Sequence, residues 1–305
     1  MGMQLERVTG AGDSRLVLYC AEHGAEHDAS YLPGRDFSIS PEYVAYLLRE
    51  DEAVLGAAVL MRTGRYLSVQ MGRFSIFHSV LGTREAYAAL LEAIRPHCAG
   101  LRSVYLFIPE QKRDTAAILA QLGFRIERYS FVLEKRAAAA AAAEARFPDG
   151  YAVHPLDPSD QAGLDQFARC LNSSFRELAG HADVSADDIR GWFDEEGYVE
   201  GGICLLTVDR EPAGTVCVMR ESEKPEAAEV MAFGILGRHR GMGLGRSLLR
   251  YACSFAACKA LNPVILSVNA ENETALGLYK SEGFVVTETV VCYALDCGFH
   301  RLGDA

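Results

Sequence analysis

Residues 229–246 read EVMAFGILGRHRGMGLGR, and this stretch decides what kind of domain the chain contains. After Glu229, residues 230–236 form an apolar run typical of a strand, and the residues after 246 have the period of an amphipathic helix. Three glycines stand between them, Gly241, Gly243 and Gly245, flanked by Arg240 and Arg246. A glycine loop before a helix lets backbone N–H groups point outward beside the positive end of the helix dipole, so it predicts a phosphate cradle.

Two common nucleotide-binding interpretations do not fit this loop. A dinucleotide-binding fold needs an acidic residue on a second βαβ strand at the usual distance, and none follows. A Walker loop needs a Gly-Lys-Ser/Thr ending, which is lacking here. The loop taken alone could also be a flexible strand–helix turn, so a second motif has to decide.

A second motif lies downstream, with fixed spacing between Asn272, Ala275, Tyr279, Gly283 and Phe284. The stretch from Glu229 to Phe284 resembles the core of the GNAT N-acetyltransferases. Residues 240–245 match that family's R/Q-x-x-G-x-G/A signature for the coenzyme A pyrophosphate, and residues 272–284 match its N-x-x-A-x-x-x-Y-x-x-x-G-F pattern. Two motifs in the family's order make the resemblance strong over this part of the chain.

The resemblance implies an acetyl-CoA donor bound without a metal. Pantetheine would lie beside the strand at 230–236 like an added strand, against Phe233 and Ile235. Gly234 would permit a bulge or a close backbone approach, and a backbone N–H there would stabilise the oxyanion of the tetrahedral intermediate. The remaining expected donor contacts are Arg240, Gly241, Met242, Gly243, Leu244, Gly245, Arg246 and Asn272.

The same resemblance implies a catalytic pair. Tyr279 would be the general acid for the departing thiolate, and Glu229 the base for the amine, directly or through water, with Glu226 as the competitor. Tyr279 follows Asn272 by seven residues, about two helical turns, so both can face the donor. Asn272 could also cap its helix, and that role is slightly favoured. His239 lies in the pyrophosphate turn and is expected to be only a loop residue.

The nine cysteines show no metal-binding spacing, and we expect most of them to pack as small hydrophobic residues. Cys292 or Cys297 could in principle carry an acyl group, but the sequence shows no paired base for either. The sequence therefore predicts direct transfer to the amine through a ternary complex.

The chain is long enough for two domains, with 305 residues of which 50% are hydrophobic. A shift of 160 residues aligns Gly123 with Gly283 and Phe124 with Phe284, each pair following a strand and a helix and preceding a strand. This repeat predicts two tandem GNAT-like domains of α/β (α+β) class, each a mixed, mostly antiparallel sheet flanked by helices. The predicted bounds are 1–136, an Ala-rich linker at 137–149, and a catalytic domain at 150–305.

The pattern of the second half predicts strands near 150–155, 202–208, 213–220, 228–236, 263–269, 284–289 and 290–296, and helices near 158–175, 185–195, 243–260 and 272–282. Ser185 and Asp188 have the spacing of a capping box. In the first half we expect strands near 53–61 and 66–77 and helices near 83–98 and 112–122.

The first copy is predicted to lack catalysis of its own. An ungapped shift by 160 replaces the site residues Glu229, Arg240, Gly243, Gly245, Asn272 and Tyr279 with Val69, Val80, Thr83, Glu85, Lys112 and Leu119. Thr83 has a Cβ where phosphate approach favours none, and Glu85 would repel a pyrophosphate. We therefore expect a structural or acceptor-shaping role for this half.

Composition limits the partners. A net charge of −11 argues against nucleic acid, and no apolar run approaches the length of a membrane span. The start of the chain lacks a targeting signal, which predicts a cytoplasmic protein. The acceptor would be a small-molecule or peptide amine. The chain resembles the mycothiol synthases in its two-copy layout, in NSSF at 172–175 and in VCYAL at 291–295. Acetylation of a pseudo-disaccharide amine is therefore an open alternative. A second alternative is a non-catalytic acyl-CoA-binding module, and the oligomeric state is not predicted.

Overall fold

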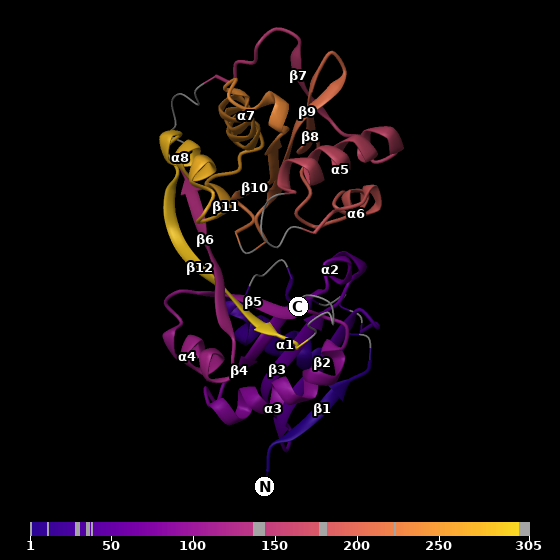
Figure 1. Cartoon of the computed structure of the whole chain (residues 1–305), viewed down its shortest axis with the longest axis vertical. Helices are drawn as coiled ribbons and strands as arrows, with labels where there is room; N and C mark the ends of the chain where they lie inside the picture. The colour runs from indigo at the N-terminus through magenta and orange to yellow at the C-terminus, as the bar shows by residue number, and fades with distance from the viewer. Residues whose placement is uncertain are drawn as a thin grey trace, which may run out of the picture. The chain divides into compact units, whose positions relative to one another are not determined.

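The computed structural model describes residues 2–10, 12–27, 31–34, 37, 39–136, 144–176, 182–222 and 224–298. The chain forms two compact units. The first consists of the described residues up to Ser130 together with those from Thr289 on, and the second of the described residues from Phe131 to Glu288. Each has a mixed, mostly antiparallel sheet flanked by helices, which confirms the predicted fold class (Figure 1).

The first unit is built on a sheet of strand order β1-β2-β3-β4-β5-β12-β6. Only β4 and β5 run parallel among the pairs whose register is defined. Helices α3 and α4 pack on one core of this sheet and α1 on another. Its elements are β1 (Gln4–Val8), α1 (Ser14–His23), η1 (Gly24–Glu26), β2 (Tyr43–Glu50), β3 (Ala53–Met61), α2 (Gly64–Ser68), β4 (Met71–Ser79), α3 (Arg84–Ile94), η3 (Arg95–Cys98), β5 (Ser103–Pro109), α4 (Arg113–Gln121), β6 (Arg125–Lys135) and the end of β12 (Val285–Asp296).

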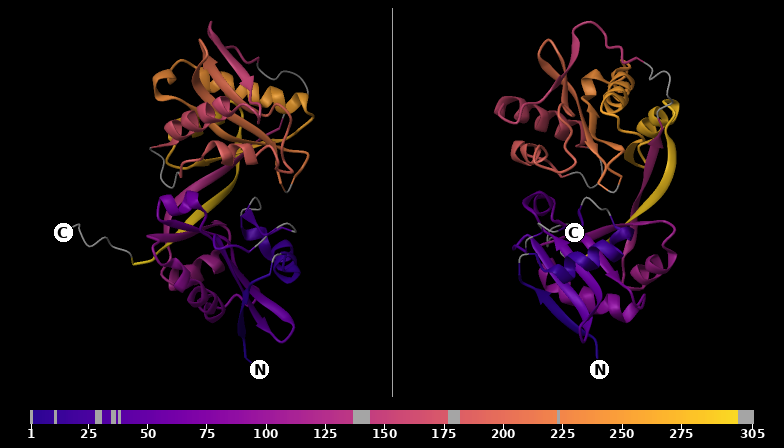
Figure 2. Two further views of the ribbon diagram at one scale, coloured as in Figure 1. Left: turned by 90° about the vertical axis from the view of Figure 1, so that its right-hand side faces the viewer. Right: turned by 180° about the vertical axis from the view of Figure 1, so that it is seen from behind.

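The second unit has the strand order β7-β8-β9-β10-β11-β6-β12. Helices α7 and α8 cover one face of this sheet, and α5 and α6 cover the other (Figures 1 and 2). None of the helices in the described part of the chain is long and apolar enough to cross a membrane. The further elements of this unit are β7 (Tyr151–Pro155), α5 (Gln161–Phe175), α6 (Ala186–Gly191), β8 (Ile203–Val208), β9 (Glu211–Arg220), β10 (Ala228–Ile235), η4 (Gly237–His239), α7 (Leu244–Cys258), β11 (Val264–Asn269) and α8 (Glu273–Ser281).

Two strands belong to both units. Strand β6 begins in the first unit and ends in the second, whereas β12 begins in the second and ends in the first. The contacts therefore place residues 131–136 in the second unit and the described residues from 289 on in the first, unlike the predicted bounds. The alanine run at 137–143, which is the first half of the predicted linker, lies outside the described residues.

The predicted elements are mostly present, with four corrections. Residues 66–77 are not one strand, because α2 precedes β4, and the two strands expected at 284–296 form the single strand β12. Helix α6 ends at Gly191 and is shorter than predicted, although the capping box of Ser185 and Asp188 is present. The sequence analysis also missed β1, α1 and β2, although α1 has the capping residue Asp13 at its start.

The internal repeat is confirmed where the two sequences align best. Gly123 follows α4 with φ 93°, and Gly283 follows α8 with φ 88°, a left-handed conformation that favours glycine. Phe124 and Phe284 come next and are both buried. Each unit therefore ends its second repeat helix in the same way and uses the same aromatic anchor in its core.

Candidate functional site

The site is organised by the separation of two neighbouring strands of the second unit. Strand β10 pairs with the parallel strand β11 only through Ala228 with Val264 and Glu229 with Ile265. Residues 230–235 continue along β9 instead. In this part of the described sheet, one backbone edge of β10 is therefore left without a strand partner, and such an edge can accept an extended ligand as an added strand.

The same segment of β10 carries an irregularity. Its register against β9 shifts between Met231 and Gly234, and Ala232 has φ 48°. The Thr215 hydroxyl donates a hydrogen bond of 2.7 Å to the Ala232 carbonyl and so fixes this conformation. A Cβ added to Gly234 would lie 2.8 Å from Ser174 Cβ, so glycine is needed where α5 approaches. The bulge expected at Gly234 is thus observed. The sequence analysis did not predict that Thr215 and Ser174 contact it, although Ser174 belongs to the NSSF stretch.

Phe233 and Ile235 follow the bulge on the part of β10 that carries the open edge. Both side chains are partly buried and pack against the core formed with α7 and α8. They therefore line this stretch with apolar surface suited to the uncharged arm of a ligand.

The glycine loop after β10 forms an uncapped helix N-terminus. Gly241 and Gly243 have φ 78° and 77°, and a Cβ added to either would meet no atom within 4 Å. These glycines are therefore required for backbone conformation and leave open space. Helix α7 begins at Leu244 with Gly243 as its N-cap, and no side chain caps it. Its first N–H groups can bind an anion, as the sequence predicted for this loop.

The other residues of the loop have different positions. Met242 is 51% exposed, whereas Leu244 is buried and anchors α7 in the core. A Cβ on Gly245 would lie 3.5 Å from Leu278 Cδ2, an ordinary contact distance, so this position tolerates a small side chain.

Both flanking arginines have internal partners. Arg240 donates to the Ile235 carbonyl and to the Ser174 carbonyl, each at 3.0 Å, and so ties the loop to β10 and α5. Arg246 pairs with Glu282, which also accepts hydrogen bonds of 2.8 and 2.9 Å from Arg250. The backbone N–H groups of α7 are therefore the main donors that the fold leaves for an anion, and these arginines contribute nearby charge.

Helix α8 places the second motif next to β10. The Asn272 side chain accepts a hydrogen bond of 3.1 Å from the Ala275 N–H, so its capping role is confirmed. The Tyr279 ring lies 6.1 Å from the Phe233 ring, and the residue is 6% exposed. Burial raises the pKa of Tyr279 to about 12. The phenol is therefore protonated near neutral pH. Its hydroxyl makes no hydrogen bond within the described ranges, so the fold does not use this donor.

Glu229 and Tyr279 lie on opposite faces of the sheet. Glu229 of β10 pairs with Met219 of β9, and Met219 packs in the core under α5 and α6. Because directly paired residues of neighbouring strands lie on the same face of a sheet, Glu229 lies on the face covered by α5 and α6. Tyr279 packs in the core under α7 and α8. The two groups thus flank the place where β10 and β11 separate. Glu226 is exposed in the turn before β10, where its carbonyl accepts from the Asn262 N–H.

The remaining candidates are engaged elsewhere. His239 lies 3.0 Å from the Tyr151 hydroxyl and from Arg238, and burial lowers its pKa, which fits a loop residue. Cys292 belongs to the first unit, where it is buried against Glu127 and burial raises its pKa to about 12. An acyl-carrying role would require a reactive thiolate, and this environment disfavours one.

The first unit corrects part of the repeat alignment. Tyr105 of β5 and Ile265 of β11 are equivalent under the shift of 160 residues. Tyr105 pairs with Arg73 of β4, whereas Ile265 pairs with Glu229 of β10. Arg73, and not Val69, therefore corresponds to Glu229. The ungapped shift was wrong by four residues here because the loop before α3 spans 80–83, whereas the loop before α7 spans 236–243. The loop of the first copy is therefore half as long as the glycine loop before α7.

Side chains of the first unit also occupy the donors that would bind a ligand. The Thr83 hydroxyl caps α3 by accepting from the Ala86 N–H, where α7 has only Gly243. The His27 ring accepts a buried hydrogen bond of 3.1 Å from the Phe77 N–H of β4. These contacts, together with the shorter loop, favour the prediction that the first copy has no catalytic site of its own.

Comparison with known proteins identifies the same region. Residues 164–284 match the model of the Acetyltransferase (GNAT) family, and this stretch contains every residue placed in the site above. The mycothiol acetyltransferase of Paenarthrobacter aurescens (strain TC1) is 28% identical over 187 residues, which cover 59% of this chain and 57% of that protein. That of Amycolatopsis mediterranei (strain U-32) is 33% identical over 118 residues, or 36% and 37% of the two chains. The chain spans about half the length, or less, of the curated relatives it matches.

Solved structures extend the likeness to the whole fold. A GCN5-related N-acetyltransferase from Sphaerobacter thermophilus superposes with a TM-score of 0.67 at 15% identity, covering 96% of each chain. A tandem GNAT protein from the clavulanic acid biosynthesis pathway gives a TM-score of 0.69 at 15% identity, covering 97% of this chain and 99% of that one. At such identities the comparison shows the fold alone, and that fold is the tandem arrangement expected from the repeat.

Proposed function

We propose that the chain transfers an acetyl group from acetyl-CoA to a primary amine in its second unit, where residues 164–284 match the model of the Acetyltransferase (GNAT) family. One observation carries the proposal. In the described sheet, residues 230–235 of β10 have an edge without a strand partner, and the glycine loop that follows them leads to the uncapped N-terminus of α7. The first feature suits a pyrophosphate and the second an extended pantetheine. Together they match the two ends of one acyl-CoA molecule.

The donor would bind mainly through the backbone. The pyrophosphate would accept hydrogen bonds from the first N–H groups of α7, with Gly241 and Gly243 leaving the space it needs. Pantetheine would add to the open edge of residues 230–235, along Phe233 and Ile235. A backbone N–H of the bulge would then stabilise the oxyanion formed on the thioester carbonyl.

Transfer would proceed without a covalent enzyme intermediate. Glu229, directly or through water, removes a proton from the amine, whose nitrogen attacks the thioester carbonyl carbon. The C–S bond breaks as the tetrahedral intermediate collapses, and the electron pair leaves on sulfur. The Tyr279 hydroxyl donates a hydrogen bond to this charged sulfur from the other face of the sheet, so Tyr279 and Glu229 do not compete for one position.

The acceptor has one specific candidate class. The relatives named above are mycothiol acetyltransferases, which favours the amine of a pseudo-disaccharide over a peptide amine. An acceptor panel should therefore contain that amine, simple amino sugars and a lysine peptide. Release of free thiol from acetyl-CoA, followed by mass spectrometry of the acetylated product, ranks them directly.

Donor binding is tested first, by calorimetric titration with acetyl-CoA. Gly245→Glu should abolish binding, because it places a carboxylate in the first turn of α7, where the first copy has Glu85. Gly245→Ala is the matched control, since its Cβ makes only an ordinary contact with Leu278 and adds no charge. A negative charge in the first turn favours helix formation, so Gly245→Glu should still fold. Binding by Gly245→Glu equal to that of wild type would refute this donor site.

A non-catalytic acyl-CoA-binding module is the remaining alternative. It predicts donor binding without acetyl transfer to any amine, and no effect on function when Glu229 and Tyr279 are replaced together. Thiol release that depends on both the amine and Tyr279 would exclude it.

A further inference from the structure

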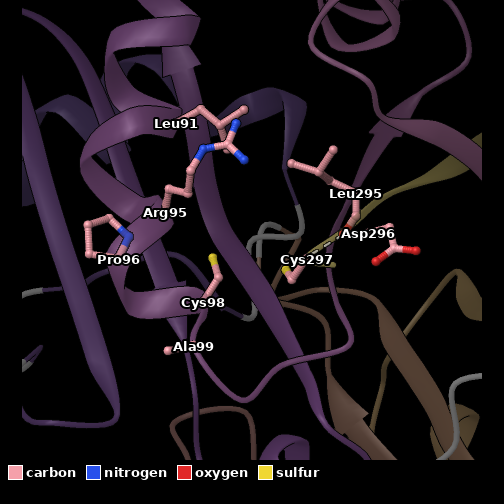
Figure 3. Close-up of a pocket in the computed structure, with 8 residues that line it drawn as sticks. All are labelled: Leu91, Arg95, Pro96, Cys98, Ala99, Leu295, Asp296 and Cys297. Carbon is pink, nitrogen blue, oxygen red and sulfur yellow. Dashed lines mark hydrogen bonds between the residues drawn. The ribbon is translucent and has the colours of Figure 1, made fainter. Parts of the chain in front are cut away.

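Two cysteines of the first unit, distant in sequence, line the same small pocket. Cys98 ends η3, and Cys297 directly follows the end of β12. The Cys297 N–H donates to the Arg102 carbonyl at 2.9 Å, and the Cys98 carbonyl accepts from the Leu101 N–H at 3.0 Å. Both sulfurs face one pocket of about 250 Å³ (Figure 3). The chain therefore brings these two thiols together only because the end of β12 joins the sheet of the first unit.

The pair has a different environment from the other cysteines. The neighbouring Cys297 thiol lowers the pKa of the Cys98 thiol, burial opposes this, and Arg62 and Arg95 also lower it. The pKa of Cys297 is raised, mainly by the neighbouring Cys98 thiol. Burial is the main cause that raises the pKa of the other described cysteines with a resolved shift, which are Cys20, Cys170, Cys204, Cys217, Cys253 and Cys292. Cys98 is thus a thiol whose surroundings favour the reactive thiolate, next to a second thiol.

We propose that Cys98 and Cys297 are a modification site that forms a reversible disulfide with a low-molecular-weight disulfide as oxidant. Both cysteines are free thiols in the structure. Cys297 is partly exposed and Cys98 is buried, and the pocket they share, which is also lined by Arg95, Pro96 and Leu295, connects them to solvent. This inference concerns the first unit and does not depend on acetyl transfer in the second.

The chemistry balances as two exchange steps. A thiolate of the pair attacks one sulfur of the oxidant, forms a mixed disulfide and releases one thiolate of the oxidant. The other cysteine then loses its proton and attacks the protein sulfur of the mixed disulfide, releasing the second thiolate. In sum, two protein thiols are oxidised by two electrons and the oxidant is reduced to two thiols.

The cross-link would fasten the end of β12 to η3. Residues 98 and 297 are 199 positions apart in a chain of 305 residues, so the bond would close a very long loop and restrict the unfolded chain strongly. Oxidation should therefore raise the apparent unfolding temperature, and a reductant such as dithiothreitol should restore the original value.

The test uses the wild-type chain and needs no substitution. The protein is incubated with oxidised glutathione, the remaining thiols are alkylated under denaturing conditions, and peptides are mapped by mass spectrometry without reduction. We expect a linked pair of peptides containing Cys98 and Cys297, lighter by two hydrogens than the reduced pair. Cys258 is exposed and serves as the internal reference for simple accessibility.

Three variants complete the experiment. The linked pair should disappear in Cys98→Ser and in Cys297→Ser and should persist in Cys258→Ser, with a thermal melt confirming that each variant is folded. The proposal is overturned if Cys258 is fully converted to a mixed disulfide while Cys98 and Cys297 remain separately alkylated. It is equally overturned if the link forms only in urea, because the folded structure would then not bring the sulfurs together.

Discussion

Tyr279→Phe removes one oxygen from the site and is the sharpest test of the proposed chemistry. The ring is buried against Phe233 and Phe284, so phenylalanine fills the same space. The hydroxyl makes no hydrogen bond in the described part of the chain, so its removal leaves no partner unsatisfied. We therefore expect an unfolding free energy within about 1 kcal/mol of wild type, with the effect confined to catalysis.

The expected size of the catalytic effect follows from the acidity of the phenol. Burial raises the pKa of Tyr279 to about 12, whereas a free thiol has a pKa of about 8.5. Complete proton transfer from Tyr279 to the thiolate would then be uphill by about 5 kcal/mol, at 1.36 kcal/mol per pKa unit. Tyr279 acts instead by hydrogen bonding to the charged sulfur, worth about 1.5–3 kcal/mol. This corresponds to a roughly 10- to 150-fold lower kcat.

The assay follows thiol release from acetyl-CoA at saturating amine, with KM for acetyl-CoA measured separately. Because the hydrogen bond forms as the sulfur becomes charged, kcat should fall while KM changes little. Tyr251→Phe is the control, since Tyr251 lies on α7 and its hydroxyl contacts the Cys204 thiol, which is not a residue of the proposed site. Its kcat should stay within about twofold of wild type.

Two outcomes would refute this reasoning. A kcat reduced by less than about threefold would show that the phenol does not interact with the leaving group. An increase in KM alone would make Tyr279 a binding residue without a role in the transition state.

Three further predictions concern the base, the first unit and the bulge. Glu229→Gln should lower kcat/KM by about 100-fold or more, as expected for loss of a general base, whereas Glu226→Gln should change it less than twofold; equal losses in steady-state assays would reject the assignment. Burial lowers the pKa of His27 from 6.5 to about 4. Between these pH values the unfolded chain binds a proton on His27 that the folded chain does not, so the folded state has its full stability only above pH 6.5. Urea titrations should show stability falling by roughly 3 kcal/mol as the pH drops from 6.5 to 4, and a His27→Gln variant with the same pH dependence would disprove this cause. Gly234→Ala should destabilise the chain by about 1–3 kcal/mol because its Cβ would meet Ser174, and an unchanged urea midpoint would show that α5 does not approach this strand.

Much of the site could be predicted because its signals are local. A glycine loop and the helix after it occupy one short stretch, and their backbone requirements appear directly as Gly241 and Gly243. Likewise, the spacing of Asn272 and Tyr279 places both on α8, where one caps the helix and the other enters the core. The partners of these residues could not be predicted. Nothing near Arg240 in the sequence indicates that its guanidinium binds the Ser174 carbonyl.

The sequence by itself determined the class of domain, the repeat and the residues of the glycine loop before α7, since each depends on local chain conformation. Only the tertiary structure decided which unit each end of β6 and β12 joins. It also decided that Arg73 corresponds to Glu229, and that Cys98 meets Cys297. Strand pairing joins segments through backbone hydrogen bonds, which carry no side-chain signature, so alternation along one strand does not identify its neighbour.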